Sequence, residues 1–217
     1  PLIRQAELLA KSYTVAVTNP PYLHKYDTLL RSFLQENYSV EKSDLAIAFV
    51  RRCADFVRPD GRIGLITMDA WMFQKSAAEF RKWLLQECSI KKVLWLGYGV
   101  FSGVMASTVA FVVQKARGQG GLFVRVTGLG SQQKKRIAEQ FGRGEVIEKE
   151  DGRVKFYQAK SADFLALAGN VLAFTLSDEL KGVLRSGSKV KDFGDVKQGL
   201  STADNERFLR LWWEVDF

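Results

Sequence analysis

The segment Asn19-Pro20-Pro21-Tyr22 has the residue types and spacing best suited to chemistry in this chain. It directly follows an apolar run, residues 13–17, that is typical of a buried strand. An amide, two rigid prolines and an aromatic ring at the carboxyl end of a strand form a stiff platform, at the place where α/β folds bind ligands. The platform suits a planar ring that carries an exocyclic amine.

An aromatic amine is a poor nucleophile because its lone pair is delocalised into the ring. The side-chain oxygen of Asn19 is able to accept one amine hydrogen, and the carbonyl of Pro20 the other. Two fixed acceptors aim the lone pair at an electrophile, which is catalysis by positioning and preorganised electrostatics. Tyr22 would stack on the ring. The structural alternative is a rigid turn that only ends the strand.

The segment Asn19-Pro20-Pro21-Tyr22 resembles the catalytic motif of class I S-adenosylmethionine-dependent amino-methyltransferases, above all those that methylate adenine N6 in DNA. Residues 44–49 and 59–67 with Ala70-Trp71 resemble the next two blocks of the same family in order and spacing, and residues 97–101 and 107–112 resemble its later block. In detail the chain is most similar to type IIG restriction-modification methylases and to the PglX methyltransferases of BREX phage defence. The resemblance covers about residues 13–115 and, more loosely, the end of the chain.

This resemblance implies the carboxyl-terminal half of a Rossmann-like α/β sheet, followed by a smaller mixed α/β extension. It also implies methyl transfer from S-adenosylmethionine to N6 of a flipped-out adenine in double-stranded DNA, in phage defence or restriction-modification. Asn19 and Pro20 would orient the amine, and Pro21 would stiffen the loop and border the cofactor together with Asn19. Tyr22 and Phe101 would sandwich the base; for Phe101, a core anchor of its loop is the alternative.

The chain departs from the family pattern at its beginning. The family's cofactor strand, with its acidic-aromatic-glycine-x-glycine loop, should lie upstream, yet only residues 1–12 precede Tyr13 and the first residue is Pro1. We therefore expect a segment of a longer protein that lacks the main S-adenosylmethionine loop and is inactive alone. We also expect non-native self-association through the strand at residues 13–18, whose outer edge is left without a neighbour.

The charge of the chain favours a polyanionic partner. The formal net charge is +8 and the pI is near 9.5. Residues 115–160 hold eleven Lys or Arg against five Asp or Glu, and the densest run is Lys134-Lys135-Arg136. Two interpretations of this run remain: its side chains contact DNA phosphates, or they form a solvated face of a helix.

Composition narrows the class of protein. No apolar stretch approaches the roughly 20 residues that span a bilayer, and no amino-terminal signal pattern is visible. Cys53 and Cys88 lack metal-like spacing, which favours reduced thiols in a cytoplasmic protein. The single histidine, His24, rules out a histidine-rich site, so we expect no metal.

Apolar periodicity predicts alternating strands and helices. The strands are expected at residues 13–17, 63–66, 93–96, 108–113 and 122–126, and the helices at 29–34, 45–57, 76–84, 132–141 and 177–184. Pro59-Asp60-Gly61 should stop the second helix, while Ser76 and Ser131 should cap the third and fourth. The family's topology makes the strand at 108–113 antiparallel.

Three domains are expected along the chain. Residues 1–116 would be the catalytic half of the methyltransferase domain, and residues 117–188 the basic extension. Residues 189–217 would start a truncated target-recognition module, with an irregular tail as the alternative. Trp71 would either rim the substrate pocket or pack in the core.

Two other functions remain open. Similar loops serve methyltransferases that act on RNA bases or on protein glutamine. A nucleic-acid-binding or assembly subunit, with the methyltransferase fold as scaffolding and other defence-system subunits as partners, would also explain the basic segment.

Overall fold

The computed structural model describes residues 2–23, 26–101, 105–118, 120–147, 152–188 and 192–194. The helices are α1 (Leu2–Ala10), α2 (Thr28–Asn37), α3 (Leu45–Phe56), α4 (Ala78–Glu87), α5 (Ser131–Arg143), α6 (Ser161–Leu165) and α7 (Asp178–Ser186). The strands are β1 (Tyr13–Thr18), β2 (Val57–Met68), β3 (Ser89–Gly97), β4 (Thr108–Gln114), β5 (Gly121–Val126) and β6 (Val154–Ala159). Within these described ranges no helix is long and apolar enough to cross a membrane. The chain divides into two units, residues 1–185 and 186–217.

The six strands form one mixed sheet in the order β1-β2-β4-β3-β5-β6. Strand β1 runs parallel to β2, β4 runs antiparallel to both β2 and β3, β3 runs parallel to β5, and β6 runs antiparallel to β5. The predicted α/β class and the antiparallel β4 are therefore confirmed. Because β5 and β6 continue this sheet, the boundary predicted near residue 116 falls between two strands of one sheet, and the three-domain division stays a prediction.

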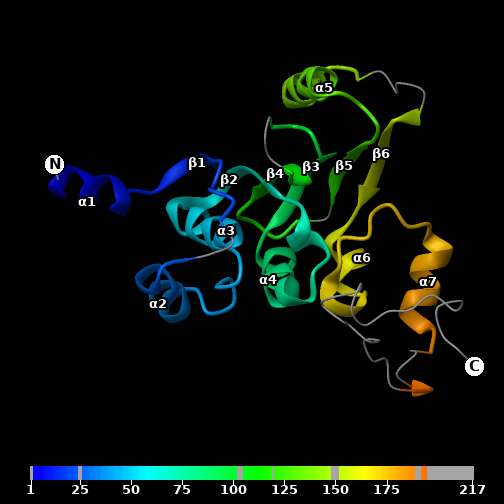
Figure 1. Ribbon diagram of the computed structural model, residues 1–217, viewed down its shortest axis with the longest axis horizontal. Coiled ribbons are helices and arrows are strands. Elements are labelled where there is room, and N and C mark those ends of the chain that lie inside the picture. The colour runs from blue at the N-terminus through cyan, green and yellow to red at the C-terminus, as the bar shows by residue number, and fades with distance from the viewer. Residues whose placement is uncertain are drawn as a thin grey trace, which may run out of the picture. The chain divides into compact units, whose positions relative to one another are not determined.

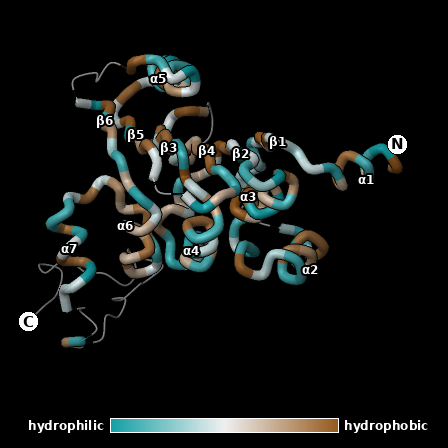
Figure 2. The backbone as a smooth tube through the Cα atoms, turned by 180° about the vertical axis from the view of Figure 1, so that it is seen from behind, coloured by the Kyte–Doolittle hydropathy of each residue, from teal (hydrophilic) through white to brown (hydrophobic). Residues whose placement is uncertain are grey.

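Alternation along the strands gives the sheet two different apolar faces. Ile63, Leu65 and Val93 point into a large core that α3, α4 and α6 cover. Leu94 and Val124 point to the other face, into a smaller core under α5. Figure 1 shows α3 and α4 on one side of the sheet and α5 on the other. In Figure 2 these helices alternate between hydrophilic and hydrophobic stretches, as expected when one helix face packs on a sheet.

The sequence analysis predicted that Pro59-Asp60-Gly61 stops the second helix, and this prediction is wrong. Helix α3 already ends at Phe56, and β2 begins at Val57, where the backbone turns extended. The register with β1 shifts between the pair Tyr13–Val57 and the pair Val15–Arg62, so the turn-forming residues are absorbed as an irregularity inside β2. Asp60 takes the strained positive φ of 65° at this point.

Two of the predicted helix caps are also wrong. A 3-10 turn, η2 (Lys75–Ala77), precedes α4, so Ala77 rather than Ser76 is the N-cap. Helix α5 is capped at Gly130, whose N–H donates to Oε1 of Gln133 at 3.1 Å. The expected start at Ser177 is confirmed, because its hydroxyl accepts a hydrogen bond from the Leu180 N–H at 3.4 Å.

Strand β1 lies at one edge of the sheet, as the sequence predicted. Among the described residues it pairs only with β2, and Val17 is 77% exposed. Helix α1 buries none of its side chains. It is tied to β1 by the Tyr13 hydroxyl, which donates to the carbonyl of Leu8 at 2.7 Å. The described residues before β1 therefore leave its outer edge open.

Candidate active site

Asn19 stands at the carboxyl end of β1 with its side chain accessible. It is exposed, whereas the next residue, Pro20, is buried and fixes the start of the platform. Asn19 also lines a cavity of about 770 Å³ on the α5 face of the sheet. The amide is thus not sealed in the interior, which is a condition for any role in binding.

The cavity beside Asn19 has an apolar floor and a basic far end. Ile66, Ala110 and Val112 form part of its floor, and α5 forms a wall. Arg62 and Lys91 also line it. A volume of this size with few polar groups is typical of sites for small organic molecules and cofactors.

The structure brings Tyr22 and Phe101 together, as the resemblance implied. Their ring centroids are 6.2 Å apart and their planes are inclined by 60°. A base held between two parallel rings needs roughly 7–8 Å, because each stacked layer takes about 3.5–4 Å. The pair is therefore too close and too tilted to hold a base, and it would have to open for one to enter. Neither ring lines the cavity beside Asn19.

The Tyr22 hydroxyl is buried and has no hydrogen-bond partner in the described part of the chain. Burial raises the pKa of this phenol, so it stays protonated at neutral pH. An unpaired buried hydroxyl costs about 1–3 kcal/mol. Such a cost is typical of a functional site, where a residue is kept for a reason other than stability.

The loop that carries Phe101 is held at two points. Gly97 and Gly99 adopt positive φ angles of 68° and 75°, which favour glycine. The Thr108 hydroxyl donates to the carbonyl of Gly97 at 3.2 Å. The ammonium group of Lys134 on α5 donates to the carbonyl of Tyr98. Helix α5 therefore supports the loop on which the Phe101 ring depends.

The contact with Tyr98 distinguishes Lys134 from Lys135 and Arg136, its neighbours in the basic run. Lys134 is only 6% exposed, and burial lowers the pKa of its ammonium group. Its burial does not fit the predicted phosphate contact. Lys135 and Arg136 are exposed and stay available for such contacts.

Asp69, immediately after β2, links strand ends through contacts that the sequence analysis missed. Its carboxylate accepts hydrogen bonds from the Trp95 indole N–H at 2.6 Å and from the Ser107 hydroxyl. Its own N–H donates to the Ser107 carbonyl at 3.0 Å. Asp69 thus joins the ends of β2 and β3 to the start of β4. An acidic residue three positions after the strand predicted at residues 63–66 was the available signal.

Trp71 packs in the core and does not rim a pocket. It is 2% exposed, its indole N–H donates to the Thr67 hydroxyl at 3.0 Å, and its ring contacts Phe80 and Phe111. Arg81 lies next to it, fully buried, and donates to the Trp71 carbonyl at 2.6 Å. Burial lowers the pKa of this guanidinium group.

Two predictions concern parts that the structure does not describe. His24 lies outside the described residues, as does the predicted target-recognition module at 189–217 apart from residues 192–194.

Comparisons with known proteins agree with the motifs. Residues 4–101 match the family described as Eco57I restriction-modification methylase. The adenine-specific methyltransferase PglX of Lacticaseibacillus casei (strain Zhang) is 30% identical over 225 residues, which cover 100% of this chain and 18% of the relative. The chain thus spans less than a fifth of that relative's length.

Two solved structures show the same fold. The type I restriction-modification methyltransferase subunit from Streptococcus thermophilus has a TM-score of 0.52 at 19% identity, over 72% of this chain and 36% of that one. The DrdV–DNA complex has a TM-score of 0.57 at 12% identity, over 82% of this chain and 20% of that one. With the motifs in the predicted order and Asn19 exposed at the end of β1, residues 4–101 are similar to the Eco57I restriction-modification methylase family.

Proposed function

We propose that this chain is the catalytic half of a site-specific DNA methyltransferase that transfers a methyl group to N6 of a flipped-out adenine. The observation that carries the proposal is the exposed Asn19 beside a cavity of about 770 Å³. Asn19 precedes Tyr22, which contacts Phe101, by three residues. The match to an adenine-specific methyltransferase over the whole chain supports it.

The residues of the platform would each take one part of the reaction. The side-chain oxygen of Asn19 and the carbonyl of Pro20 would accept the two hydrogens of the adenine amine. Their fixed directions would turn the nitrogen lone pair toward the methyl group, so that the N–C bond forms as the bond from carbon to sulfur breaks, and the proton that the nitrogen loses would pass to water. Tyr22 and Phe101 would open and stack on the two faces of the base, which replaces the stacking lost when it leaves the duplex.

The methyl donor would be S-adenosylmethionine, which supplies an electrophilic methyl group bound to sulfur. Asn19 and Pro21 are both exposed, and Asn19 lines the cavity, which fits a role at the border of the donor. The residues that would hold most of the donor are those of the glycine loop that the family carries upstream.

Double-stranded DNA would be the substrate, and Lys135 and Arg136 would contact its phosphates. Both are exposed on α5, which also supports the Phe101 loop through Lys134. Phosphate contacts of this kind give affinity that falls with salt and does not depend on sequence. The similarity to PglX and the match of residues 4–101 to a restriction-modification methylase family support a role in restriction-modification or BREX phage defence, in which other subunits would be partners.

The product of the reaction tests this proposal. The natural protein that contains this chain, at its full length, is incubated with methyl-labelled S-adenosylmethionine and separately with duplex DNA, RNA or cell protein. We expect label in DNA only, recovered as N6-methyladenine after digestion to nucleosides and mass spectrometry.

Label in RNA or in protein glutamine would show that RNA or protein, and not DNA, is the substrate. DNA binding without methyl transfer would favour a scaffold function. Tyr22→Ala is the matched variant: because it removes one stacking face, we expect it to weaken transfer roughly 10- to 100-fold, equivalent to about 1–3 kcal/mol.

A further inference from the structure

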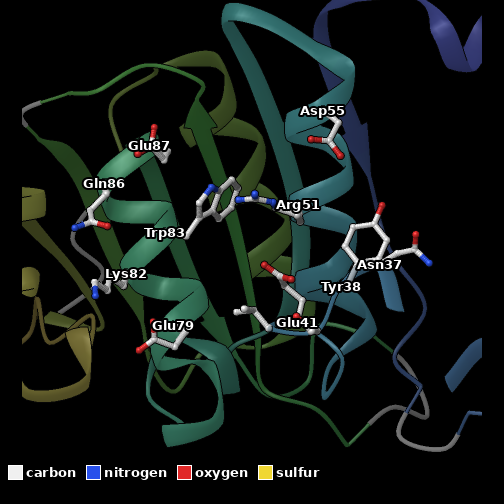
Figure 3. Close-up of a pocket in the computed structure, with 12 residues that line it drawn as sticks. Asn37, Tyr38, Glu41, Arg51, Asp55, Glu79, Lys82, Trp83, Gln86 and Glu87 are labelled. Carbon is white, nitrogen blue, oxygen red and sulfur yellow. The ribbon is translucent and has the colours of Figure 1, made fainter. Parts of the chain in front are cut away.

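A second cavity, of about 610 Å³, lies between α3 and α4, on the face of the sheet opposite α5. The segment between α2 and α3 closes one side of it. Figure 3 shows side chains from all three segments turned into this space. It shares no residue with the cavity beside Asn19, so it is a separate site.

One aromatic and one cationic side chain meet across this cavity. The Arg51 guanidinium on α3 extends toward α4 and stacks over the Trp83 ring, with its central carbon 4.2 Å from the ring centroid. This cation–π contact shows that the Trp83 ring is oriented to stack on a planar cation. Trp83 is only half-buried in the described structure, although Phe80 and Leu84 of the same helix are fully buried.

A buried carboxylate faces the same space. Glu41 is only 5% exposed, and Figure 3 shows its side chain turned into the gap between the two helices. Its carboxylate interacts with its own main-chain N–H and with the field of Arg51, but within the described residues it forms no ion pair. Burial is the main cause that raises the pKa of Glu41. A buried carboxylate without a paired cation is costly, and an incoming cation would remove that cost.

The charge of the cavity is opposite to that of the chain. Four carboxylates line it (Glu41, Asp55, Glu79 and Glu87) against the two cations Arg51 and Lys82, a formal net charge of −2 in a chain of +8. Asp55 and Glu87 at the rim also form exposed ion pairs with Arg52 and Arg117, and such pairs contribute little. An acidic hollow on a basic protein complements a basic partner.

We propose that this cavity is a docking site for an arginine side chain presented by a basic segment of a partner protein. The incoming guanidinium would pair with Glu41 and lie against Trp83. Arginine fits better than lysine because its planar fork binds a carboxylate through two hydrogen bonds and stacks on an aromatic face. Arg51 already shows that a guanidinium is accommodated on this ring.

The test follows the Trp83 indole N–H by two-dimensional NMR in the 217-residue chain, with the signal assigned from Trp83→Phe. The probe is the blocked peptide acetyl-Gly-Arg-Gly-amide, and the matched peptides carry Lys or Glu in place of Arg. We expect a saturable shift with the Arg peptide, a weaker one with Lys and none with Glu.

Two variants sharpen the test. Glu41→Gln is expected to weaken Arg-peptide binding at least tenfold, while the exposed rim variant Glu79→Gln changes it less than threefold. Arg51→Gln, which removes the competing cation and keeps Glu41, is expected to tighten binding at least threefold. Thermal unfolding confirms that each variant is folded.

Three outcomes would overturn the proposal: equal shifts with the Glu peptide, unchanged affinity in Glu41→Gln, or weaker binding in Arg51→Gln. A shift that instead appears only as protein concentration rises, and that Arg136→Ala removes, would assign the cavity to a second copy of the chain and also overturn it.

Discussion

The two faces of the central sheet differ in how completely they are covered. On the α3–α4 face, Ile63 and Phe80 are fully buried in one continuous core. On the α5 face, the helix covers β3 and β5, while the part over β1, β2 and β4 borders the cavity beside Asn19. The comparison teaches that the larger buried core lies on the α3–α4 face, whereas the larger of the two cavities, which borders Asn19, lies on the α5 face.

The largest expected effect comes from truncating one apolar side chain on each face of the sheet. Phe80→Ala should lower the free energy of unfolding by about 3–5 kcal/mol, because it leaves a cavity in the covered core. Val17→Ala, on the open face and 77% exposed, should change it by less than about 0.5 kcal/mol. Urea unfolding followed by circular dichroism measures both. Similar losses for the two variants would contradict the difference between the faces.

Arg81 extends the comparison to polar groups on the covered side. Its guanidinium donates to the carbonyls of Trp71, Gln74, Gly169 and Asn170 at 2.6–3.1 Å, which ties η1 (Ala70–Met72) to η4 (Ala168–Asn170). Arg81→Leu should cost about 3 kcal/mol, because buried carbonyls lose their donors. The exposed Arg117→Leu, which breaks only the 3.3 Å pair with Glu87, should cost under about 1 kcal/mol. Equal costs would show that the Arg81 contacts add nothing to stability.

The buried Cys88 thiol on the covered face should make the free energy of unfolding depend on pH. Burial raises its pKa to about 11, whereas in the unfolded chain it titrates near 9. The folded state therefore favours the neutral thiol, and this contribution is complete below pH 9 and is lost as pH rises toward 11. A shift of this size is worth about 2–3 kcal/mol. Between pH 8 and 10.5, the free energy of unfolding should fall more in the wild type than in Cys88→Ala. If urea unfolding gives parallel pH curves for the two proteins, the prediction is wrong.

The smallest expected effect has the opposite sign and lies at the candidate active site. Tyr22→Phe removes a buried hydroxyl that lacks a partner and keeps the ring, so the free energy of unfolding should rise by up to about 1 kcal/mol. Differential scanning calorimetry would measure the gain. A loss of stability would mean that the hydroxyl is paired in solution.

Much of the fold was predictable because it follows from apolar periodicity. Strand β1 and helix α2 lie within a few residues of the predicted ranges, and the antiparallel β4 agrees with the family topology. The helix caps predicted at Ser76 and Ser131 were wrong for different reasons: a 3-10 turn precedes α4, and the cap of α5 lies one residue earlier, where the Gly130 N–H donates to the Gln133 side chain.

The site was predictable where chemistry depends on adjacent residues and not where it depends on packing. Asn19 and Tyr22 were found because the motif is continuous along the chain. The burial of Lys134 follows from its contact with Tyr98, 36 residues away in sequence, and a run of basic residues contains no sign of it. The clamp formed by Asp69 depends in the same way on Trp95 and Ser107.

The central claim is that the amide of Asn19 orients an exocyclic amine for methyl transfer. Its most direct test is the single-turnover rate of methyl transfer to duplex DNA by Asn19→Ala, in the full-length natural protein and at saturating DNA. We expect the rate to fall on the order of 10²–10³-fold, with the dissociation constant for DNA unchanged within about twofold. An unchanged rate, or a loss explained entirely by weaker DNA binding, would contradict the claim.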